Sequence, residues 1–254
     1  LILISDDGQY AANQEKAVSI PSAASPLPDG PEESIPTPGS GSIESLCDSK
    51  GWDPSQVVKV LLFVATLDDE TLQPLLVSLR GDQEVNPTKV VNAVSRILEK
   101  GVLDCRPITP DDQNRQKIDP IPFGSIGPDL SDDALQGAKT WEPSFLRLAD
   151  ETATELTRFV CGANTPDQHR FNTSWAAIGQ KPVNLDLRNA RAGDVCTHNP
   201  ESLLTEKRGI EVGHIFQLGR KYSEAMESRF TNENGKTEPF WMGCYGIGVS
   251  RLAQ

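Results

Sequence analysis

Two apolar runs lie close together in the chain, and they limit most strongly what it can fold into. Residues 57–64 form a nearly continuous series of β-branched and aliphatic side chains, and residues 75–79 form a second series. The acidic stretch at residues 68–70 lies between them and is typical of a turn. Because both runs are apolar on both faces, they predict two neighbouring strands buried inside a sheet.

Helix signals follow the second run. Asn86 can cap a helix, and Pro87 suits its first position. Apolar residues then recur with helical spacing up to a stop at Gly101. These residues are Val90, Val91, Val94, Ile97 and Leu98. A helix is therefore predicted directly after the two strands.

The rest of the chain alternates short elements of both kinds. Asp150 can cap a second helix over residues 151–160, with Gly162 as its stop. Further strands are predicted at residues 183–187, 210–218 and 240–245, with a helix around residues 222–227 and a glycine-rich turn at residues 246–248. This order predicts an α/β (α+β) fold.

The first fifty residues have a different character. Residues 1–20 predict a short strand, a turn at residues 6–8 and a helical stretch over residues 10–18. In residues 21–46, six Pro, six Ser and three Gly make up 15 of the 26 positions. Such a segment buries too little apolar surface to offset its chain entropy, so we expect a linker or a disordered loop.

Composition excludes several classes of protein. The 254 residues carry a formal net charge of -12, which excludes nucleic-acid binding by bulk electrostatics. The most apolar stretch, residues 57–65, is interrupted by Lys59, so no membrane span is expected. Five cysteines without a Cys-x-x-Cys pair fit a reducing compartment and no thiolate zinc site. The chain starts at Leu1 in an apolar run without a methionine, which we interpret as part of a longer protein.

A few residues could carry chemistry. Lys89 lies in the first turn of its helix, where it is either a solvated lysine or part of an anion site at the helix amides. The glycines of residues 124–128 either form an ordinary turn or point backbone N–H groups at a carbonyl or phosphate oxygen. His169 follows a loop at residues 162–164, and the three histidines lack the spacing of a metal site.

The C-terminal part carries a dense series of motifs. Residues 208–219 read RGIEVGHIFQLG, residues 221–223 read KYS, and residues 242–251 read MGCYGIGVSR. This series resembles bacterial-type prolyl-tRNA synthetase, and its last block resembles motif 3 of class II synthetases. Residues 10–13 with Glu15 are similar to the segment after motif 2 in the same family.

The resemblance implies a domain organisation. Residues 1–20 correspond to the catalytic domain after motif 2, residues 21–50 to a linker, residues 51–207 to an editing insertion domain, and residues 208–254 to the catalytic segment with motif 3. It implies a mixed-sheet insertion domain flanked by parts of an antiparallel-sheet catalytic domain. It further implies an internal fragment that lacks motifs 1 and 2 and the anticodon-binding domain, and that does not aminoacylate alone.

The same resemblance implies an editing site that hydrolyses alanine wrongly attached to proline tRNA. Lys89 corresponds to the functional lysine that holds the charged 3′ end, and we expect Lys89→Ala nearly to abolish deacylation. The glycine loop supplies amides to polarise the ester carbonyl. The implied residues of this site are Lys89, Gly124, Gly127, Asp150 and His169. No cofactor is needed for editing.

The flanking segments imply a second site, for ATP and proline. Arg251 corresponds to the motif 3 arginine that contacts the ATP phosphates. The other implied residues are His214, Phe216, Gln217, Cys244, Gly246 and Gly248. In the intact enzyme the implied partners are tRNA(Pro), proline and ATP with Mg²⁺, in a cytoplasmic homodimer. A structural reading, in which Cys244 is core and the two glycines only permit tight packing, is compatible with these roles.

Two other functions remain open at this point. One is a free-standing deacylase of related fold that acts in trans. The other is a non-catalytic module that binds tRNA 3′ ends. Synthetase-like segments at both ends of the chain favour the synthetase fragment over both.

Overall fold

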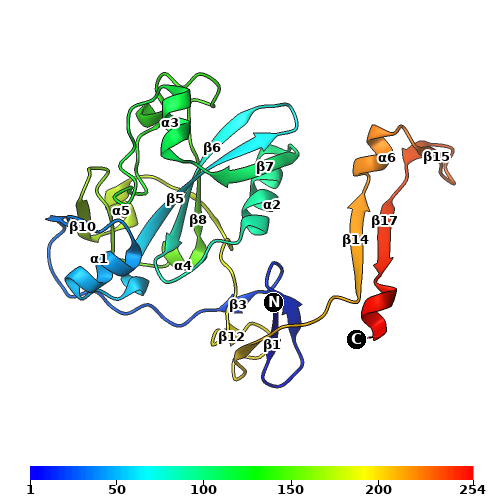
Figure 1. The fold of residues 1–254 in the computed structure, drawn as a ribbon, viewed down its shortest axis with the longest axis horizontal. Helices are drawn as coiled ribbons and strands as arrows, with labels where there is room; N and C mark the ends of the chain where they lie inside the picture. Colours follow the sequence, from blue (N-terminus) through cyan, green and yellow to red (C-terminus); the bar gives the residue numbers. More distant parts are fainter. Residues whose placement is uncertain (254) are drawn as a thin grey trace. The chain divides into compact units, whose positions relative to one another are not determined.

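A computed structural model describes residues 1–253, which divide into two compact units (Figure 1). The larger unit is Leu3–Glu206, and the smaller one joins Leu1–Ile2 to the segment from Lys207 onward. In the described part of the chain, no helix has the length and apolar character needed to cross a membrane.

The larger unit is built around an eight-stranded mixed sheet of order β11-β8-β6-β5-β9-β10-β4, with β7 also paired to β5. Its parallel pairs are β5–β9, β6–β8 and β8–β11, and the others are antiparallel. The strands are β4 (Glu33–Pro36), β5 (Val57–Leu67), β6 (Leu72–Arg80), β7 (Val102–Pro107), β8 (Leu146–Asp150), β9 (Phe159–Gly162), β10 (Gln168–Thr173) and β11 (Val183–Leu185). The fold class is therefore mixed α/β, with a mixed central sheet.

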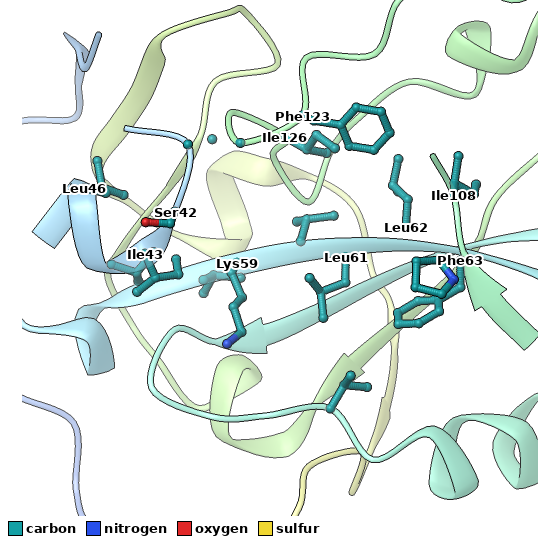
Figure 2. Close-up of a pocket in the computed structure, with 18 of the residues that line it drawn as sticks. Ser42, Ile43, Leu46, Lys59, Leu61, Leu62, Phe63, Ile108, Phe123 and Ile126 are labelled. Atoms are coloured by element: carbon teal, nitrogen blue, oxygen red, sulfur yellow. The ribbon is translucent and has the colours of Figure 1, made fainter. Parts of the chain in front are cut away.

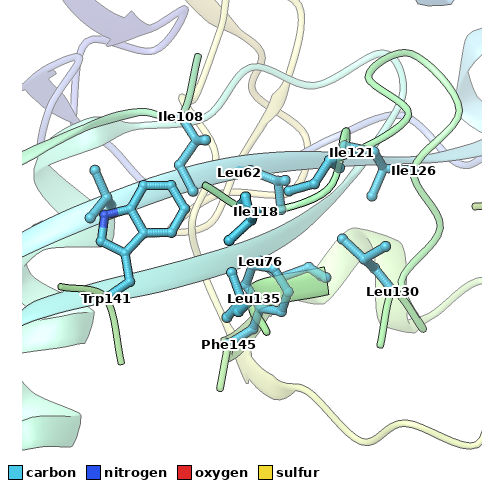
Figure 3. Packing of buried hydrophobic residues seen from close by; sticks show 11 residues of the cluster. Leu62, Leu76, Ile108, Ile118, Ile121, Ile126, Leu130, Leu135, Trp141 and Phe145 are labelled. Atoms are coloured by element: carbon cyan, nitrogen blue, oxygen red, sulfur yellow. The ribbon is translucent and has the colours of Figure 1, made fainter. Parts of the chain in front are cut away.

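The two apolar runs form the centre of this sheet, as predicted. They are β5 and β6, and the acidic turn between them is tightened by Glu70, whose φ is 66°. Because both strands are buried on both faces, their side chains point alternately into two hydrophobic cores, one on each face of the sheet. Figure 3 shows the core on one face, where Leu62 and Leu76 meet Ile118, Trp141 and Phe145.

The other face is covered by α2 (Pro87–Leu98), the predicted helix. Asn86 accepts a hydrogen bond from the Lys89 amide as its N-cap, and Pro87 takes the first position. Val90 and Val94 are fully buried against β5 and β6. The helix is capped two residues before the expected stop, at Glu99, which adopts the left-handed conformation in place of Gly101.

The remaining helices of the larger unit are short. They are α1 (Ile43–Lys50), α3 (Pro110–Gln116), α4 (Glu151–Thr154) and α5 (Trp175–Ile178), with the 3₁₀ turns η1 (Pro54–Gln56) and η2 (Asp132–Leu135). Two small sheets complete the unit, of order β13-β1-β2 and β12-β3. Their strands are β1 (Ile2–Ser5), β2 (Ala11–Asn13), β3 (Ser19–Ile20), β12 (Val195–Cys196) and β13 (Leu204–Lys207).

The helix predicted over residues 10–18 is wrong. The chain forms β2 there and then turns, because Asn13 accepts the amide of Lys16 on its side chain and that of Ala17 on its carbonyl. Such a local side-chain bond competes with helix formation. The turn carries Ala17 into a small core with Leu3 and Leu204.

The Pro-rich segment at residues 21–46 is more structured than expected. Its β4 pairs antiparallel with β10, and α1 begins at Ile43 behind a capping box of Ser42 and Ser45. The stretch before β4 is held by side chains of the sheet domain, since Gln56 Nε2 donates to the carbonyl of Pro26 at 2.6 Å. The composition of the segment does not predict this order, because the segment is stabilised by pairing with the edge of the sheet and not by a core of its own.

The second predicted helix, over residues 151–160, is only partly right. Asp150 caps α4 as expected, but α4 ends at Thr154. Phe159 and Val160 belong to β9, which is fully buried between β5 and β10. A short apolar run looks the same in a buried helix and in a buried strand, and here pairing with β5 decides for the strand.

The smaller unit contains two antiparallel ribbons, β14–β17 and β15–β16. The predicted turn at residues 246–248 is wrong in part, because Gly246 and Ile247 continue β17 opposite His214 and Gly213. Its elements are β14 (Gly213–Gly219), α6 (Lys221–Ala225), β15 (Arg229–Thr231), β16 (Thr237–Pro239), β17 (Met242–Ile247) and the 3₁₀ turn η3 (Val249–Ala253).

Candidate functional site

The larger unit contains a cavity of about 650 Å³ that runs along β5 (Figure 2). This volume lies within the usual range of small-molecule sites. The floor is β5 from Val57 to Phe63, and Ser42, the N-cap of α1, also lines the cavity. Gly124, Ile126, Gly162 and His169 line the wall. Three weak sequence signals, the glycine loop at residues 124–128, the loop at residues 162–164 and His169, therefore meet at one place.

The two loops of this wall are packed backbone to backbone. The Gly127 amide donates to Asn164 Oδ1 at 2.7 Å, and the Asn164 amide donates to the carbonyl of Ser125 at 2.9 Å. A Cβ at Gly127 would lie 2.4 Å from the carbonyl oxygen of Gly162. Real Cβ atoms do not approach oxygen so closely, so this junction requires glycine.

The hydrogen bonds of the loop decide which amides remain free for a ligand. Ser125 N–H donates to Pro122, and Gly127 N–H is used by Asn164. Within residues 1–253, the amides of Gly124 and Ile126 have no acceptor. Both residues line the cavity, so these two N–H groups are the candidate donors for a developing oxyanion.

His169 lies on β10 and is almost completely buried, with 4% of its surface exposed. Its Nδ1 lies 2.7 Å from the hydroxyl oxygen of Thr37. Burial lowers the pKa of His169, while a backbone hydrogen bond with Gly124 acts in the opposite direction. The imidazole therefore stays neutral at physiological pH and shapes the wall as an uncharged ring.

The lining of the cavity also includes a lysine that the sequence analysis did not name as a site residue. Lys59 lies on β5 and lines the cavity (Figure 2). Its Nζ donates to the carbonyl of Gly81 at 3.0 Å and to that of Gln83. Burial lowers the pKa of its amine. One sequence signal pointed to it, since a single lysine interrupts an otherwise apolar strand, and a cation at such a position needs polar partners.

Lys89 lies elsewhere. It is not among the residues that line the cavity. Its Nζ lies 2.7 Å from Asp186 Oδ2 and donates to the carbonyls of Arg188 and Ala17 at 2.9 Å and 3.2 Å. The lysine thus ties α2 to two neighbouring segments of the chain, and these three partners take up its three N–H donors.

Asp150 is also outside the cavity lining, and it is 1% exposed. One carboxylate oxygen accepts from the amide and hydroxyl of Thr152, at 3.0 Å and 2.6 Å. The other accepts from the amides of Leu187 and Arg188, at 2.8 Å and 3.0 Å. The carboxylate therefore joins the end of β8 to the segment after β11.

In the smaller unit, the strand register gathers several predicted residues. His214 is opposite Gly246, and Phe216 is opposite Cys244. Directly opposed residues share one face of an antiparallel ribbon, so these four lie on the same face. The His214 and Phe216 rings stack with centroids 3.9 Å apart and planes at 1°.

The other three predicted residues lie around this face. Gln217 is paired with Gly243 and therefore points to the opposite face. Gly248 follows β17 and accepts the Arg251 amide at the start of η3. The Arg251 guanidinium donates through one nitrogen to the carbonyl of Glu211 at 3.0 Å, which leaves further N–H donors for an anion.

Metal ligands do not cluster in the described residues. Across residues 1–253, no group of three or more His, Cys, Asp or Glu side chains is placed to hold a metal ion. The five cysteines are free thiols there. The polar groups that line the cavity of the larger unit include backbone amides, Lys59 and the neutral His169.

Comparison with known families gives a direct match for the larger unit. The family described as the aminoacyl-tRNA editing domain matches residues 37–178. This range includes β5, the glycine loop at residues 124–128 and His169.

Curated relatives match over the whole chain. It is 89% identical over 254 residues to a proline--tRNA ligase of Synechococcus sp. (strain CC9605), and 65% identical to that of Parasynechococcus marenigrum (strain WH8102). A proline--tRNA ligase of Prochlorococcus marinus (strain MIT 9313) is 60% identical. All of this chain is covered in each case, but it spans only 43%, 43% and 42% of these proteins.

Proposed function

The chain belongs to the aminoacyl-tRNA editing domain family, and from that premise we propose that its β5 cavity hydrolyses the ester between a wrong amino acid and a tRNA. The observation that carries this proposal is the meeting of free loop amides, Lys59 and His169 in one cavity. We propose alanyl-tRNA(Pro) as the substrate, because the relatives are proline--tRNA ligases.

The chemistry needs few side chains. A water oxygen attacks the ester carbonyl carbon, and the amides of Gly124 and Ile126 donate to the oxyanion that forms. When the C–O bond breaks, the ribose oxygen leaves and takes up a proton, so free alanine and tRNA result. The neighbouring ribose hydroxyl can help to activate the water, and no side-chain nucleophile is required.

Lys59 is the cation that we assign to this site. Two of its three N–H donors are used by Gly81 and Gln83, and the third remains for a substrate oxygen. This assignment replaces the one expected for Lys89, which is outside the cavity lining and has three partners of its own. We propose that Lys59 holds the 3′ end of the tRNA through an oxygen near the ester.

His169 and Asp150 would have different roles in selecting the amino acid. His169 is a neutral, buried wall residue, held by Thr37, and it limits the space beside the Gly124 loop. We propose that the ring narrows the cavity locally, beside the Gly124 loop, so that this end admits alanine and excludes the larger proline ring. Asp150 would act from a distance, by fixing the segment of Leu187 and Arg188.

The smaller unit supports a proposal for the intact enzyme, of which this chain is 43% by length in the relatives. There, ATP-dependent attachment of proline to tRNA(Pro) would use the ribbon face of His214, Phe216, Cys244 and Gly246, with Gln217 and Gly248 beside it. Arg251 fits ATP because its guanidinium has free donors for a phosphate. ATP would supply the leaving group that activates the proline carboxylate.

Three further assignments are part of the same proposal. Mg²⁺ would enter with ATP in the intact enzyme, which would be a cytoplasmic homodimer. The editing insertion would be residues 51–207, the linker residues 21–50, and the class II catalytic domain would contribute residues 1–20 and 208–254. These catalytic segments would belong to an antiparallel sheet.

The test is to incubate alanyl-tRNA(Pro) with the 254-residue chain and to follow release of alanine against the rate without protein. We expect accelerated hydrolysis with a Lys59 requirement. Tight binding of tRNA 3′ ends without hydrolysis would support a non-catalytic binding module instead. A natural reading frame that ends with this segment would support a deacylase that acts in trans.

A further inference from the structure

The floor of the cavity has a break in its hydrogen bonding. On the side of β5 away from β6, β9 pairs with Val57 and Val58, and β7 pairs with residues 63–67. No strand of the described chain pairs with this side of β5 over residues 59–62. The break lies within the cavity, because Val60 and Leu62 both line it.

The direction of the peptide groups at this break follows from two hydrogen bonds. The carbonyl of Val57 accepts from Gly81 at the β6 side, and the carbonyl of Leu62 accepts from Ile108 at the β7 side. Alternate residues of a strand point their N–H and C=O groups to alternate edges. Val60 and Leu62 therefore both face the break.

Three peptide groups at the break have no partner in residues 1–253. They are the N–H and C=O of Val60 and the N–H of Leu62. Val60 is half-buried, and an unpaired peptide group that is removed from water is costly. The break thus offers a donor, an acceptor and a second donor in a row to any ligand in the cavity.

The cavity is larger than its proposed reaction requires. An alanyl ester fills only a small part of about 650 Å³. The remaining wall is mostly apolar and includes Val85. Phe63 and Phe123 are among its side chains (Figure 2). Phe123 is 41% exposed, and aromatic side chains of this kind stack on nucleobases. A flat, apolar group with polar atoms along one edge fits such a space.

We propose, on the basis of the proposed editing function, that the break in β5 recognises the terminal adenine of the tRNA 3′ end. Adenine presents an acceptor, N1, beside a donor, the N6 amino group. The Leu62 N–H donates to N1, and the Val60 carbonyl accepts from N6. The backbone of β5 thereby selects the base, while Lys59 on the same strand holds the oxygen near the ester.

Base analogues at the 3′ end test this recognition without changing the protein. Alanyl-tRNA(Pro) is prepared with terminal adenosine, 1-deazaadenosine, purine riboside or 7-deazaadenosine. Loss of N1 or of the N6 amino group removes one hydrogen bond each, so we expect kcat/KM for deacylation to fall about tenfold or more. The 7-deaza analogue keeps N1 and N6 and serves as the matched control, with an unchanged rate. Equal hydrolysis of all four would overturn the adenine assignment.

A binding measurement separates this inference from the editing function. Adenosine is titrated into the ¹⁵N-labelled chain, with purine riboside as the control. We expect the amide resonances of Val60 and Leu62 to shift with adenosine and to shift much less with purine riboside. If adenosine leaves both resonances unchanged, the inference is wrong even where alanyl-tRNA is hydrolysed. If both resonances shift but no alanyl-tRNA is hydrolysed, the proposed editing function is the part that fails.

Discussion

The Nδ1 atom of His169 lies 2.7 Å from the Oγ1 atom of Thr37, and both residues are at least 96% buried. Thr37 follows β4, the edge strand from the Pro-rich segment, and His169 is on β10, to which β4 pairs. This bond joins the N-terminal segment to a wall of the cavity. The orientation of the histidine ring therefore depends on a part of the chain that the sequence predicts to be a linker.

Folding stability should depend on pH through His169. Burial lowers the pKa of His169 below its ordinary value of 6.5, so the unfolded chain takes up a proton at a higher pH than the folded chain does. The contribution of the neutral His169 to the free energy of unfolding is fully present above pH 6.5 and is lost as the pH falls towards the lowered pKa. Thermal unfolding at several pH values should show that the melting temperature falls more steeply with decreasing pH for the wild type than for His169→Gln. Identical slopes for the two proteins would contradict the buried, neutral histidine.

Deacylation should depend on Lys59 and not on Lys89. We expect Lys59→Ala to lower kcat/KM for alanyl-tRNA(Pro) by about 10²-fold or more, because the cation in the cavity is lost. Lys89→Ala removes an ion pair with the partly exposed Asp186, so it should cost stability and leave most of the activity at temperatures where the chain is folded. Circular dichroism confirms folding of each variant. The opposite pattern would restore the sequence-based assignment of Lys89.

The close contact between Gly127 and Gly162 should tolerate no side chain. Gly127→Ala places a Cβ 2.4 Å from the Gly162 oxygen, so the loops must separate, at a cost of about 1–3 kcal/mol in unfolding free energy. We expect deacylation to fall as well, because the free amides of the loop move. Gly41→Ala is the control for stability, since its Cβ meets nothing within 4 Å. Denaturant unfolding that shows equal midpoints for both variants would argue against the packed junction.

Asp150 should act on stability more than on catalysis. In the wild type, four donors point at the oxygens of the Asp150 carboxylate. Asp150→Asn places an amide NH₂ group against some of these donors, so we expect the free energy of unfolding to fall by about 1–3 kcal/mol. Asp186→Asn is a matched control at a more exposed carboxylate, where the loss should stay below about 1 kcal/mol. Chemical unfolding measures both. If Asp150→Asn left stability intact and abolished deacylation, Asp150 would belong to the substrate pocket.

The role proposed for Arg251 can be tested in a full-length enzyme that contains this segment. Arg251→Ala removes the guanidinium that would contact the ATP phosphates, so proline-dependent ATP–pyrophosphate exchange should fall about 10²-fold or more. Editing of alanyl-tRNA(Pro) by the same variant should be unchanged, because the cavity lies within the larger unit. Normal exchange would remove Arg251 from the ATP site.

Local sequence signals predict the centre of this fold well. The β5–β6 pair and α2 were predictable because burial on both faces and an Asn-Pro cap leave few alternatives. The helix predicted at residues 10–18 is absent and the one predicted at residues 151–160 is much shorter, because a polar turn at Asn13 and the pairing of β9 with β5 override local preference. The order of the predicted linker could not be predicted from its sequence either, because it comes from pairing of β4 with β10, a strand distant in sequence.

For the site, the sequence analysis named the glycine loop and His169, which line the cavity, and it did not name Lys59, which lines it as well. The glycine loop and His169 meet in one cavity, and the resemblance of both segments to an editing insertion predicted them as parts of one site. Lys89 and Lys59 could not be ranked from sequence, because α2 brings one lysine to Asp186 and β5 brings the other to the cavity. The three-dimensional arrangement places Lys59 in the cavity lining and Lys89 outside it.

The break in the pairing of β5 also bears on how the protein avoids association with itself. Unpaired strand edges are templates on which a second chain can add a strand, a common start of aggregation. Here β9 and β7 flank the open residues end to end, so no more than about four residues are accessible. A segment this short, recessed in a cavity, is too small to nucleate a strand from another molecule. The fold thus keeps backbone groups open for a small ligand without the risk that an exposed sheet edge normally brings.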